Sequence, residues 1–481
     1  MKRLIFEQLR EWKNRKNRKP LILKGARQVG KSYIVEQFAK ESFGQYLRID
    51  FLLHDHFFKI FNENQSLEPA IILEKIAALT GLDFAPSTLA QTLLFLDEIQ
   101  ECPGAITSLK FFCEKLPELS IVATGSYLGI MANQHSFPVG KVEYIALMPM
   151  NFEEFLLASD PTLFKFYEKI DIVLSNEGGN ISIDEFYHER LLNKWKDYLM
   201  IGGMPEVVKT YLKNINLPSS LSSSTNPMIK IQALRKMREI QEQLLEGYRS
   251  DFSKYAGKLN ATHILHVFNS IPNQLSKSFD ENVNKYKFTG VIPRHKGFES
   301  VRGPLTWLST SRLVIKSFIA KKSHLPLSAY TEENNFKLFY HDIGLLMASL
   351  KIPVEQLLLD EVGHYKGPIA ENFVATELFS LYDDHLYSWS EGLAEVEFLI
   401  NSNQGPIACE VKSSAKFRRS KSLDSFVEKY HPSLALKIST KNLGHNKETK
   451  ILSLPFYLLY SFLNRLRSHT PAHPDHNIDL K

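Results

Sequence analysis

The segment LILKGARQVGKSYIVEQF, residues 21–38, constrains the fold of this chain more than any other. An apolar run is followed by a Gly-x-x-x-x-Gly-Lys-Ser pattern and then by an amphipathic stretch. Such glycines permit a loop whose backbone N–H groups point at phosphate oxygens, while the lysine reaches the outer phosphates and the serine ligates magnesium. The pattern predicts a strand, a phosphate-binding loop and a helix; the alternative is an ordinary glycine-rich turn. The residues expected to bind nucleotide are Gly25, Ala26, Arg27, Gln28, Val29, Gly30, Lys31, Ser32 and Tyr33.

A second segment supplies carboxylates for the same chemistry. TLLFLDEIQ, residues 92–100, is a continuous apolar run, typical of a strand buried on both faces, that ends in Asp97 and Glu98. Asp97 and Ser32 are expected to hold magnesium, and Glu98 to orient and deprotonate the attacking water. Alone, this segment would equally suit two solvated carboxylates. Together with the loop, it predicts an ATP and Mg²⁺ site in which Lys31 and Glu98 are catalytic.

A third apolar run, LSIVATGS at residues 119–126, predicts another strand of the same sheet. Strand ends converge on the ligand crevice in a doubly wound sheet, so the hydroxyls of Thr124 and Ser126 are candidate sensors of the terminal phosphate. A simple Gly-Ser turn after a buried strand explains the same residues equally well.

The composition sets broad limits on the class of protein. The 481 residues are too many for one core, so several domains are expected. The balance of 58 basic to 53 acidic residues permits a polyanionic partner without requiring one. The three cysteines match no metal or disulfide spacing, and no apolar run is long enough to span a bilayer. We therefore expect a cytoplasmic protein with no membrane partner.

The middle of the chain is predicted to be mainly helical. Residues 152–212 suggest a small lid domain, and the Ser-rich stretch at 217–227 suggests a linker. Helices followed by a short hairpin between residues 258 and 335 suggest a winged helix that contacts duplex DNA. The alternative is a winged helix used for packing or protein contact, with a solvated basic face. The basic residues available for phosphate contacts are Arg294, Lys296, Arg302, Lys316, Lys321 and Lys322.

The last third of the chain contains a second candidate site. Glu371 lies near the start of a predicted helix, Glu397 lies on the strand AEVEFLI, and Glu410 and Lys412 share one face of the strand within GPIACEVKSS. Carboxylates and a lysine on one face suit a second Mg²⁺ or Mn²⁺, with Lys412 activating water for phosphodiester attack. The alternatives are a strand pair with satisfied surface carboxylates, or an intact fold without chemistry. The basic run at 416–422 suits phosphates or plain solvation equally.

The order of these segments resembles that of a group of bacterial and archaeal AAA-type P-loop ATPases. The resemblance implies ATP binding, hydrolysis and a C-terminal domain of unknown function that is similar to the PD-(D/E)XK nuclease fold. It rests on the segments GARQVGKS, LFLDEIQECP, VATGS, MPMNFEEFL, YLMIGGMPEVV, KLFYHDIGLL, GPIAENFVATEL, AEVEFLI and CEVKSS.

Two positions depart from the pattern of that group. Where its members usually carry Gly-Arg, this chain has Gly140 and Lys141, and no arginine occurs between Arg48 and Arg190. Lysine cannot reproduce the planar fork of an arginine finger, so we expect a weak substitute, an arginine from elsewhere, or slow turnover. Glu397 stands where an aspartate is usual.

The predicted fold class is α/β multidomain. We expect an AAA-like parallel-sheet ATPase core at 1–151, a helical lid at 152–216, a linker at 217–228, a helix plus winged helix at 229–335, a nuclease-like α/β domain at 336–468 and a disordered tail at 469–481. The leading hypothesis is a DNA-associated ATPase whose nucleotide state controls the C-terminal domain. The alternative is a nucleotide-dependent signalling or scaffold switch that binds a protein partner and cuts nothing.

Overall fold

A computed structural model describes residues 1–62, 66–125, 138–172, 182–215, 227–256, 258–281, 285–353, 356, 366–383, 385–402, 404–413, 421–446 and 448–468. The chain divides into two compact units. Unit 1 comprises Met1–Met148 with Thr310–Arg312, and unit 2 comprises Pro149–Ser309 with Leu313–Lys481. Within the part described, no helix combines the length and the apolar character needed to cross a bilayer.

Unit 1 contains a five-stranded sheet in the order β2-β3-β4-β1-β5, and every neighbouring pair is parallel. This confirms the predicted parallel core, because the apolar runs at 21–24, 92–97 and 120–124 become β1, β3 and β4. Every residue of β3 is buried, as a strand covered on both faces requires. The strands are β1 (Leu21–Lys24), β2 (Gln45–Asp50), β3 (Thr92–Asp97), β4 (Ser120–Thr124) and β5 (Glu143–Ala146).

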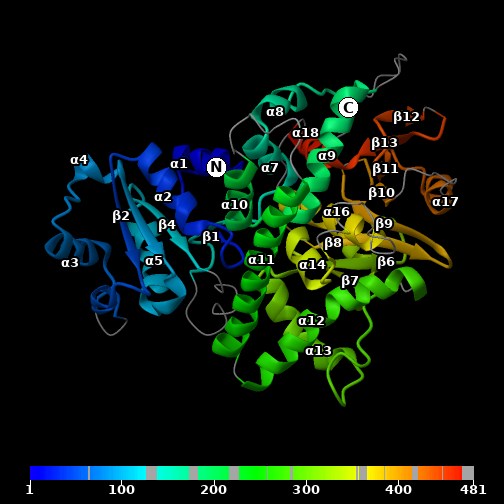
Figure 1. The fold of residues 1–481 in the computed structure, drawn as a ribbon. Helices are drawn as coiled ribbons and strands as arrows, with labels where there is room; N and C mark the ends of the chain where they lie inside the picture. The colour runs from blue at the N-terminus through cyan, green and yellow to red at the C-terminus, as the bar shows by residue number, and fades with distance from the viewer. Residues whose placement is uncertain are drawn as a thin grey trace. The chain divides into compact units, whose positions relative to one another are not determined.

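Helices pack against both faces of this sheet (Figure 1). Helices α3 and α5 share one apolar cluster with the side chains of Leu94, Leu96, Ile121 and Ala123. Successive side chains of a strand point to opposite faces of the sheet, and no residue of α2 belongs to that cluster. Helix α2 contacts β2, β3 and β4 from the other face, and α1 packs against α2. The helices of unit 1 are α1 (Ile5–Asn14), α2 (Lys31–Ser42), η1 (Asp55–Lys59), α3 (Pro69–Thr80), α4 (Pro86–Leu89), η2 (Ile99–Glu101) and α5 (Pro103–Lys115).

Unit 2 contains an eight-stranded mixed sheet in the order β12-β13-β11-β10-β9-β8-β6-β7. The pairs β6/β8, β10/β11 and β11/β13 are parallel, and the other neighbours are antiparallel. The strands are β6 (Val314–Ala320), β7 (Thr331–Tyr340), β8 (Leu386–Glu391), β9 (Ala394–Ile400), β10 (Ile407–Val411), β11 (Ala435–Ser439), β12 (Gly444–Asn446) and β13 (Ile451–Pro455).

The helices of unit 2 surround this sheet (Figure 1). Leu423 and Phe426 of α17 pack on Trp389, Val396 and Leu399, while α16 is buried along most of its length. The helices are α7 (Phe152–Ser159), α8 (Pro161–Tyr167), α9 (Glu185–Ile201), α10 (Pro205–Ile215), α11 (Pro227–Ala256), α12 (Lys258–Glu281), α13 (Phe298–Thr310), η4 (Leu327–Tyr330), α14 (Ile343–Ser349), α16 (Lys366–Tyr382), α17 (Lys421–Tyr430), η6 (Phe456–Leu458) and α18 (Leu459–Ser468).

The structure differs from the predicted domain plan in two respects. The hairpin expected to form the wing is β6 and β7, but β6 also pairs in parallel with β8, so the hairpin is an integral part of the eight-stranded sheet. Helices α7 to α10, expected as a separate lid, belong to the same compact unit as that sheet. The Ser-rich stretch at 217–226, residues 416–420 of the basic run and the tail lie outside the described residues.

Candidate nucleotide site

The phosphate-binding loop joins β1 to α2, as the sequence predicted. Gly30 precedes α2 in the left-handed region, with φ 93°, a conformation that favours glycine. The Lys31 ammonium donates hydrogen bonds to the carbonyl oxygens of Gly25, at 3.0 Å, and Ala26, at 2.9 Å. The N–H groups at the start of this 12-residue helix point along its axis and favour bound anions. Loop and helix together form a cradle suited to phosphate oxygens.

Lys31 belongs to the same electrostatic site as the carboxylates of β3. Burial lowers the pKa of Lys31 to about 8, and the charges of Glu98 and Asp97 oppose that shift. The nearby charge of Arg27 lowers this pKa further. A bound phosphate would therefore add the negative charge that favours protonated Lys31.

Asp97, at the end of β3, is almost completely buried and is held by three donors. Its Oδ1 accepts hydrogen bonds from the Thr124 hydroxyl and from the backbone N–H of Glu98, the latter at 3.1 Å. Its Oδ2 accepts a hydrogen bond from Arg48 at 2.7 Å. The predicted sensor Thr124 thus contacts Asp97 directly. Ser126, the other predicted sensor, lies outside the described residues.

Glu98 adopts the left-handed conformation, with φ 51°. Few non-glycine residues do so, and such strain often accompanies function. Its Oε2 accepts a hydrogen bond of 2.7 Å from the side-chain amide of Gln100. This contact holds the carboxylate one residue beyond Asp97, the position at which the sequence predicted a general base.

Sequence reasoning missed the roles of Arg48 and Gln100. Gln100 follows Glu98 by two residues, so the hydrogen bond between their side chains could have been predicted from the segment DEIQ. Arg48 lies on β2, and its pairing with Asp97 depends on β2 and β3 being neighbours, with Asp50 opposite Asp97. Nothing in the local sequence around residue 48 indicates that neighbour.

The donors of this site fit magnesium. The Ser32 hydroxyl and the Asp97 carboxylate are hard oxygen ligands, which Mg²⁺ prefers, and Mg²⁺ usually shares its shell with phosphate oxygens and water. Lys141, which stands where the resembled group usually carries arginine, pairs with Glu114 on α5 at 2.9 Å. The oxygen donors predicted to hold the metal thus suit Mg²⁺, and Lys141 has an acidic partner on α5.

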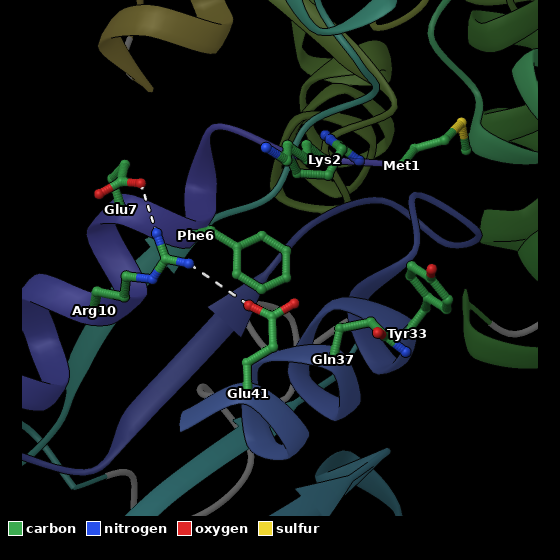
Figure 2. Close-up of a pocket in the computed structure, with 9 residues that line it drawn as sticks. Met1, Lys2, Phe6, Glu7, Arg10, Tyr33, Gln37 and Glu41 are labelled. Atoms are coloured by element: carbon green, nitrogen blue, oxygen red, sulfur yellow. Dashed lines mark hydrogen bonds and ion pairs between the residues drawn. The ribbon is translucent and has the colours of Figure 1, made fainter. Parts of the chain in front are cut away.

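A pocket of about 310 Å³ adjoins the loop where α1 packs beside α2 (Figure 2). The pocket is lined by Phe6 from α1 and by Tyr33 and Gln37 from α2 (Figure 2). Arg3 connects this segment to the loop, because it donates to the carbonyl oxygens of Val29, at 3.3 Å, and Met148, at 2.6 Å. The lining residues are Met1, Lys2, Arg3, Phe6, Glu7, Arg10, Tyr33, Gln37 and Glu41.

Comparison with known proteins agrees with this geometry. Residues 17–156 match the family described as an AAA domain. Unit 1 therefore contains an AAA-type P-loop ATPase domain. Residues 226–356 and 366–457 match two domains of unknown function, DUF8612 and DUF4143. The predicted combination of an AAA-type ATPase domain with a C-terminal domain of unknown function is confirmed.

The comparisons with whole chains find only distant likeness. The chain is similar to the Walker-type ATPase PABY2304 of Pyrococcus abyssi, at 15% identity over 72% of this chain and 94% of that one, with a TM-score of 0.42. It is also similar to PCH-2 of C. elegans, at 13% identity over 48% of this chain and 67% of that one, with a TM-score of 0.26. No curated protein sequence matches the chain.

In unit 2, beyond the AAA domain, the second group of predicted residues does come together. The charges of Glu371, Glu410 and Lys412 all act on Glu397, and burial raises the pKa of Glu397 to about 8. Oε2 of Glu397 accepts a hydrogen bond of 3.1 Å from the backbone N–H of Val411, on the neighbouring strand β10. The ammonium of Lys412 lies 2.9 Å from Glu410.

A lysine that the sequence did not indicate lies within this group, and 12% of its side chain is exposed. Lys337 of β7 pairs with Glu371 at 3.1 Å and with Glu395 at 2.5 Å. Those carboxylates raise its pKa although burial lowers it. Between the pairs Leu399–Tyr387 and Val396–Trp389, two residues of β9 lie opposite one residue of β8, so a bulge interrupts the predicted alternation. Among the described residues, no group of three or more His, Cys, Asp or Glu side chains is arranged to hold a metal ion.

Several basic residues predicted to contact DNA phosphates have partners within the chain. Arg302 pairs with Glu333 at 2.9 Å, and Lys321 pairs with Glu332. Lys316 lies over the rings of Phe336, at 4.1 Å, and Phe318, at 4.3 Å, and burial lowers its pKa to about 8. Arg294, Lys296 and Lys322 are exposed.

Proposed function

We propose that the AAA domain binds ATP and hydrolyses it with Mg²⁺. Lys31 and the loop amides bind the phosphates, Ser32 and Asp97 hold the metal, and Glu98 is the general base. When bound, Mg²⁺ neutralises charge on the phosphate oxygens. One observation supports this function above the others: the Lys31 ammonium lies in the field of both Asp97 and Glu98. The phosphate-binding lysine and the strand-end carboxylates thus act on one centre.

The pocket beside the loop is proposed to receive the base of ATP. Tyr33 directly follows Ser32, so a nucleotide whose phosphates lie in the loop can extend along α2. Phe6 and the half-exposed Tyr33 offer aromatic surfaces for stacking, and the amide of Gln37 offers both a donor and an acceptor. These side chains favour a planar heterocycle.

Steady-state turnover of ATP by the purified protein tests the proposed hydrolysis. Glu98→Gln removes the base while it leaves Lys31, Ser32 and Asp97 intact. We expect turnover to fall at least about 100-fold in this variant while ATP binding persists. Equal turnover in the wild type and the variant would refute hydrolysis by this site.

For unit 2 we propose the role of a nucleotide-dependent switch that binds a protein partner. Lys337 already supplies a positive charge to Glu371 and Glu395, as a metal would. Internal partners also engage Arg302, Lys316 and Lys321. These contacts favour the switch over the DNA-associated, nuclease-like hypothesis.

Duplex DNA in the turnover assay distinguishes the two roles. The switch predicts ATP turnover that is indifferent to DNA between 50 and 200 mM salt, and no strand cleavage with Mg²⁺ or Mn²⁺. A rise in turnover with DNA that is absent in Glu98→Gln, together with cleavage lost in Lys412→Ala, would establish the nuclease-like role instead.

A further inference from the structure

Arg48 on β2 connects the magnesium-binding carboxylate to two other acidic residues. Its guanidinium lies 2.7 Å from Asp97, 2.6 Å from Glu36 of α2 and 3.0 Å from Asp50. The side chain of Asp97 is 2% exposed and that of Arg48 is 33% exposed. A charge pair at this burial is screened far less than a surface pair, so it influences the affinity of the site for cations.

The hydrogen bonds of Asp97 leave little capacity for another donor. An ionised carboxylate offers about four acceptor positions. Thr124, the Glu98 N–H and Arg48 occupy three positions on Asp97, and Arg48 is the charged partner among them. A water molecule in the shell of Mg²⁺ would have to share Oδ2 with Arg48 or replace it.

Arg48 has alternative partners if Asp97 is taken from it. Glu36 and Asp50 lie on separate elements, α2 and β2, and each contacts the guanidinium directly. If Asp97 leaves the guanidinium, its charge therefore remains compensated by the other two carboxylates. A transfer of Asp97 from Arg48 to the metal should therefore change the free energy of folding little.

We propose that Arg48 is an internal counter-ion that competes with magnesium for Asp97. It thereby sets the magnesium concentration at which the AAA domain binds ATP tightly. This inference rests on the proposed function, because it assumes that Asp97 serves Mg²⁺ and ATP. A role in merely orienting Asp97 for the metal makes the opposite prediction, since loss of the arginine would then raise the magnesium requirement.

The test is a magnesium titration that follows the binding of a fluorescent, non-hydrolysable ATP analogue. Arg48→Gln should lower the half-saturating Mg²⁺ concentration about tenfold, because a positive charge near the metal is removed. Arg48→Lys, which keeps the charge, should stay within about threefold of the wild type. Arg15→Gln is the matched control, since Arg15 pairs with Glu143 and not with Asp97, Glu36 or Asp50. Affinity in EDTA gives the metal-free reference for each protein.

A second substitution keeps the proposal testable if Arg48→Gln does not fold. Glu36→Gln removes one alternative partner of Arg48 and should raise the half-saturating Mg²⁺ concentration, whereas the exposed Glu74→Gln should leave it unchanged. An unchanged or higher value in folded Arg48→Gln would overturn the counter-ion role. No change in Glu36→Gln would do the same. Failure of the wild type to bind the analogue would refute the proposed ATP site itself, and with it this inference.

Discussion

The carboxylate of Glu377 accepts a hydrogen bond of 3.0 Å from the backbone N–H of Phe152, a residue 225 positions earlier in the chain. Phe152 is the first residue of α7, and Asn151 caps that helix by accepting from the N–H of Glu154 at 2.9 Å. Glu377 therefore satisfies another of the orphan N–H groups at this helix start, and it connects α16 to α7 within unit 2.

The burial of Glu377 makes the stability of unit 2 depend on pH, although the hydrogen bond from Phe152 opposes the shift in its pKa. Burial raises the pKa of Glu377 to about 8 and that of Glu153 to about 7. The folded state thus retains protons that the unfolded state releases above about pH 4.5. Stability is greatest below that value and falls as the pH rises through 8, by up to about 1.4 kcal/mol per pH unit for each proton. Glu377→Gln should flatten this decline.

Thermal unfolding between pH 5 and pH 9 measures the effect. The midpoint of Glu377→Gln should exceed that of the wild type at pH 8.5, because glutamine keeps an acceptor for the Phe152 N–H without a buried charge. The exposed Glu189→Gln should follow the wild type across the range. Parallel curves for Glu377→Gln and wild type would show that Glu377 is not the group responsible.

Close packing around Gly203 gives a second prediction. A Cβ at this position would lie 1.9 Å from the carbonyl oxygen of Met150, and the Gly203 N–H donates to Asp342 at 2.6 Å. Gly203→Ala must therefore displace backbone, and we expect a loss of at least about 3 kcal/mol in the free energy of unfolding. Gly247→Ala, inside α11 with open space around it, should gain up to about 1 kcal/mol. Chemical denaturation of both variants checks this, and similar midpoints would contradict it.

Local patterns sufficed to predict the AAA core. The apolar runs of β1, β3 and β4, the glycine-lysine loop and the carboxylates after β3 are short-range signals, and parallel strands bring their ends to one edge. The same reasoning placed Glu371, Glu397, Glu410 and Lys412 together, because E-x-K on a strand and a neighbouring strand carboxylate share a face.

Contacts between distant segments could not be predicted in this way. The β6–β7 hairpin has the sequence of a wing, and only its pairing with β8 makes it part of the large sheet. Lys337 reaches Glu395 although β6 and β8 separate their strands in the sheet, and strand propensity does not encode such a contact. Arg48 likewise acquires its role from its neighbour β3.

The proposed base pocket predicts a specific kinetic signature. Phe6→Ala and Tyr33→Ala should each raise the KM for ATP about tenfold with little change in kcat, because stacking on a base is worth about 1–3 kcal/mol and is uniform between ground and transition states. Phe186→Ala removes a similarly exposed aromatic ring from unit 2 and should leave the KM unchanged. Unaltered KM values in both pocket variants would exclude this pocket as the base site.

Lys337, the shared cation of Glu371 and Glu395, gives the last prediction. Lys337→Met keeps much of the side-chain volume but leaves Glu371 and Glu395 without their shared cation, so we expect unit 2 to lose about 3–5 kcal/mol of stability. Lys429→Met breaks the exposed pair with Glu391 and should cost less than about 1 kcal/mol.

The effect of a divalent metal on thermal unfolding distinguishes two hypotheses for this carboxylate group: that Lys337 takes the place of a metal, or that the group binds one. If Lys337 takes the place of a metal, Mn²⁺ should leave the thermal midpoint of unit 2 unchanged in the wild type and raise it in Lys337→Met, whose carboxylates are unpaired. The thermal shift is to be measured without nucleotide, so that binding at the AAA domain contributes least. A large Mn²⁺ shift in the wild type that disappears in Glu397→Gln would instead identify the metal site that the sequence predicted.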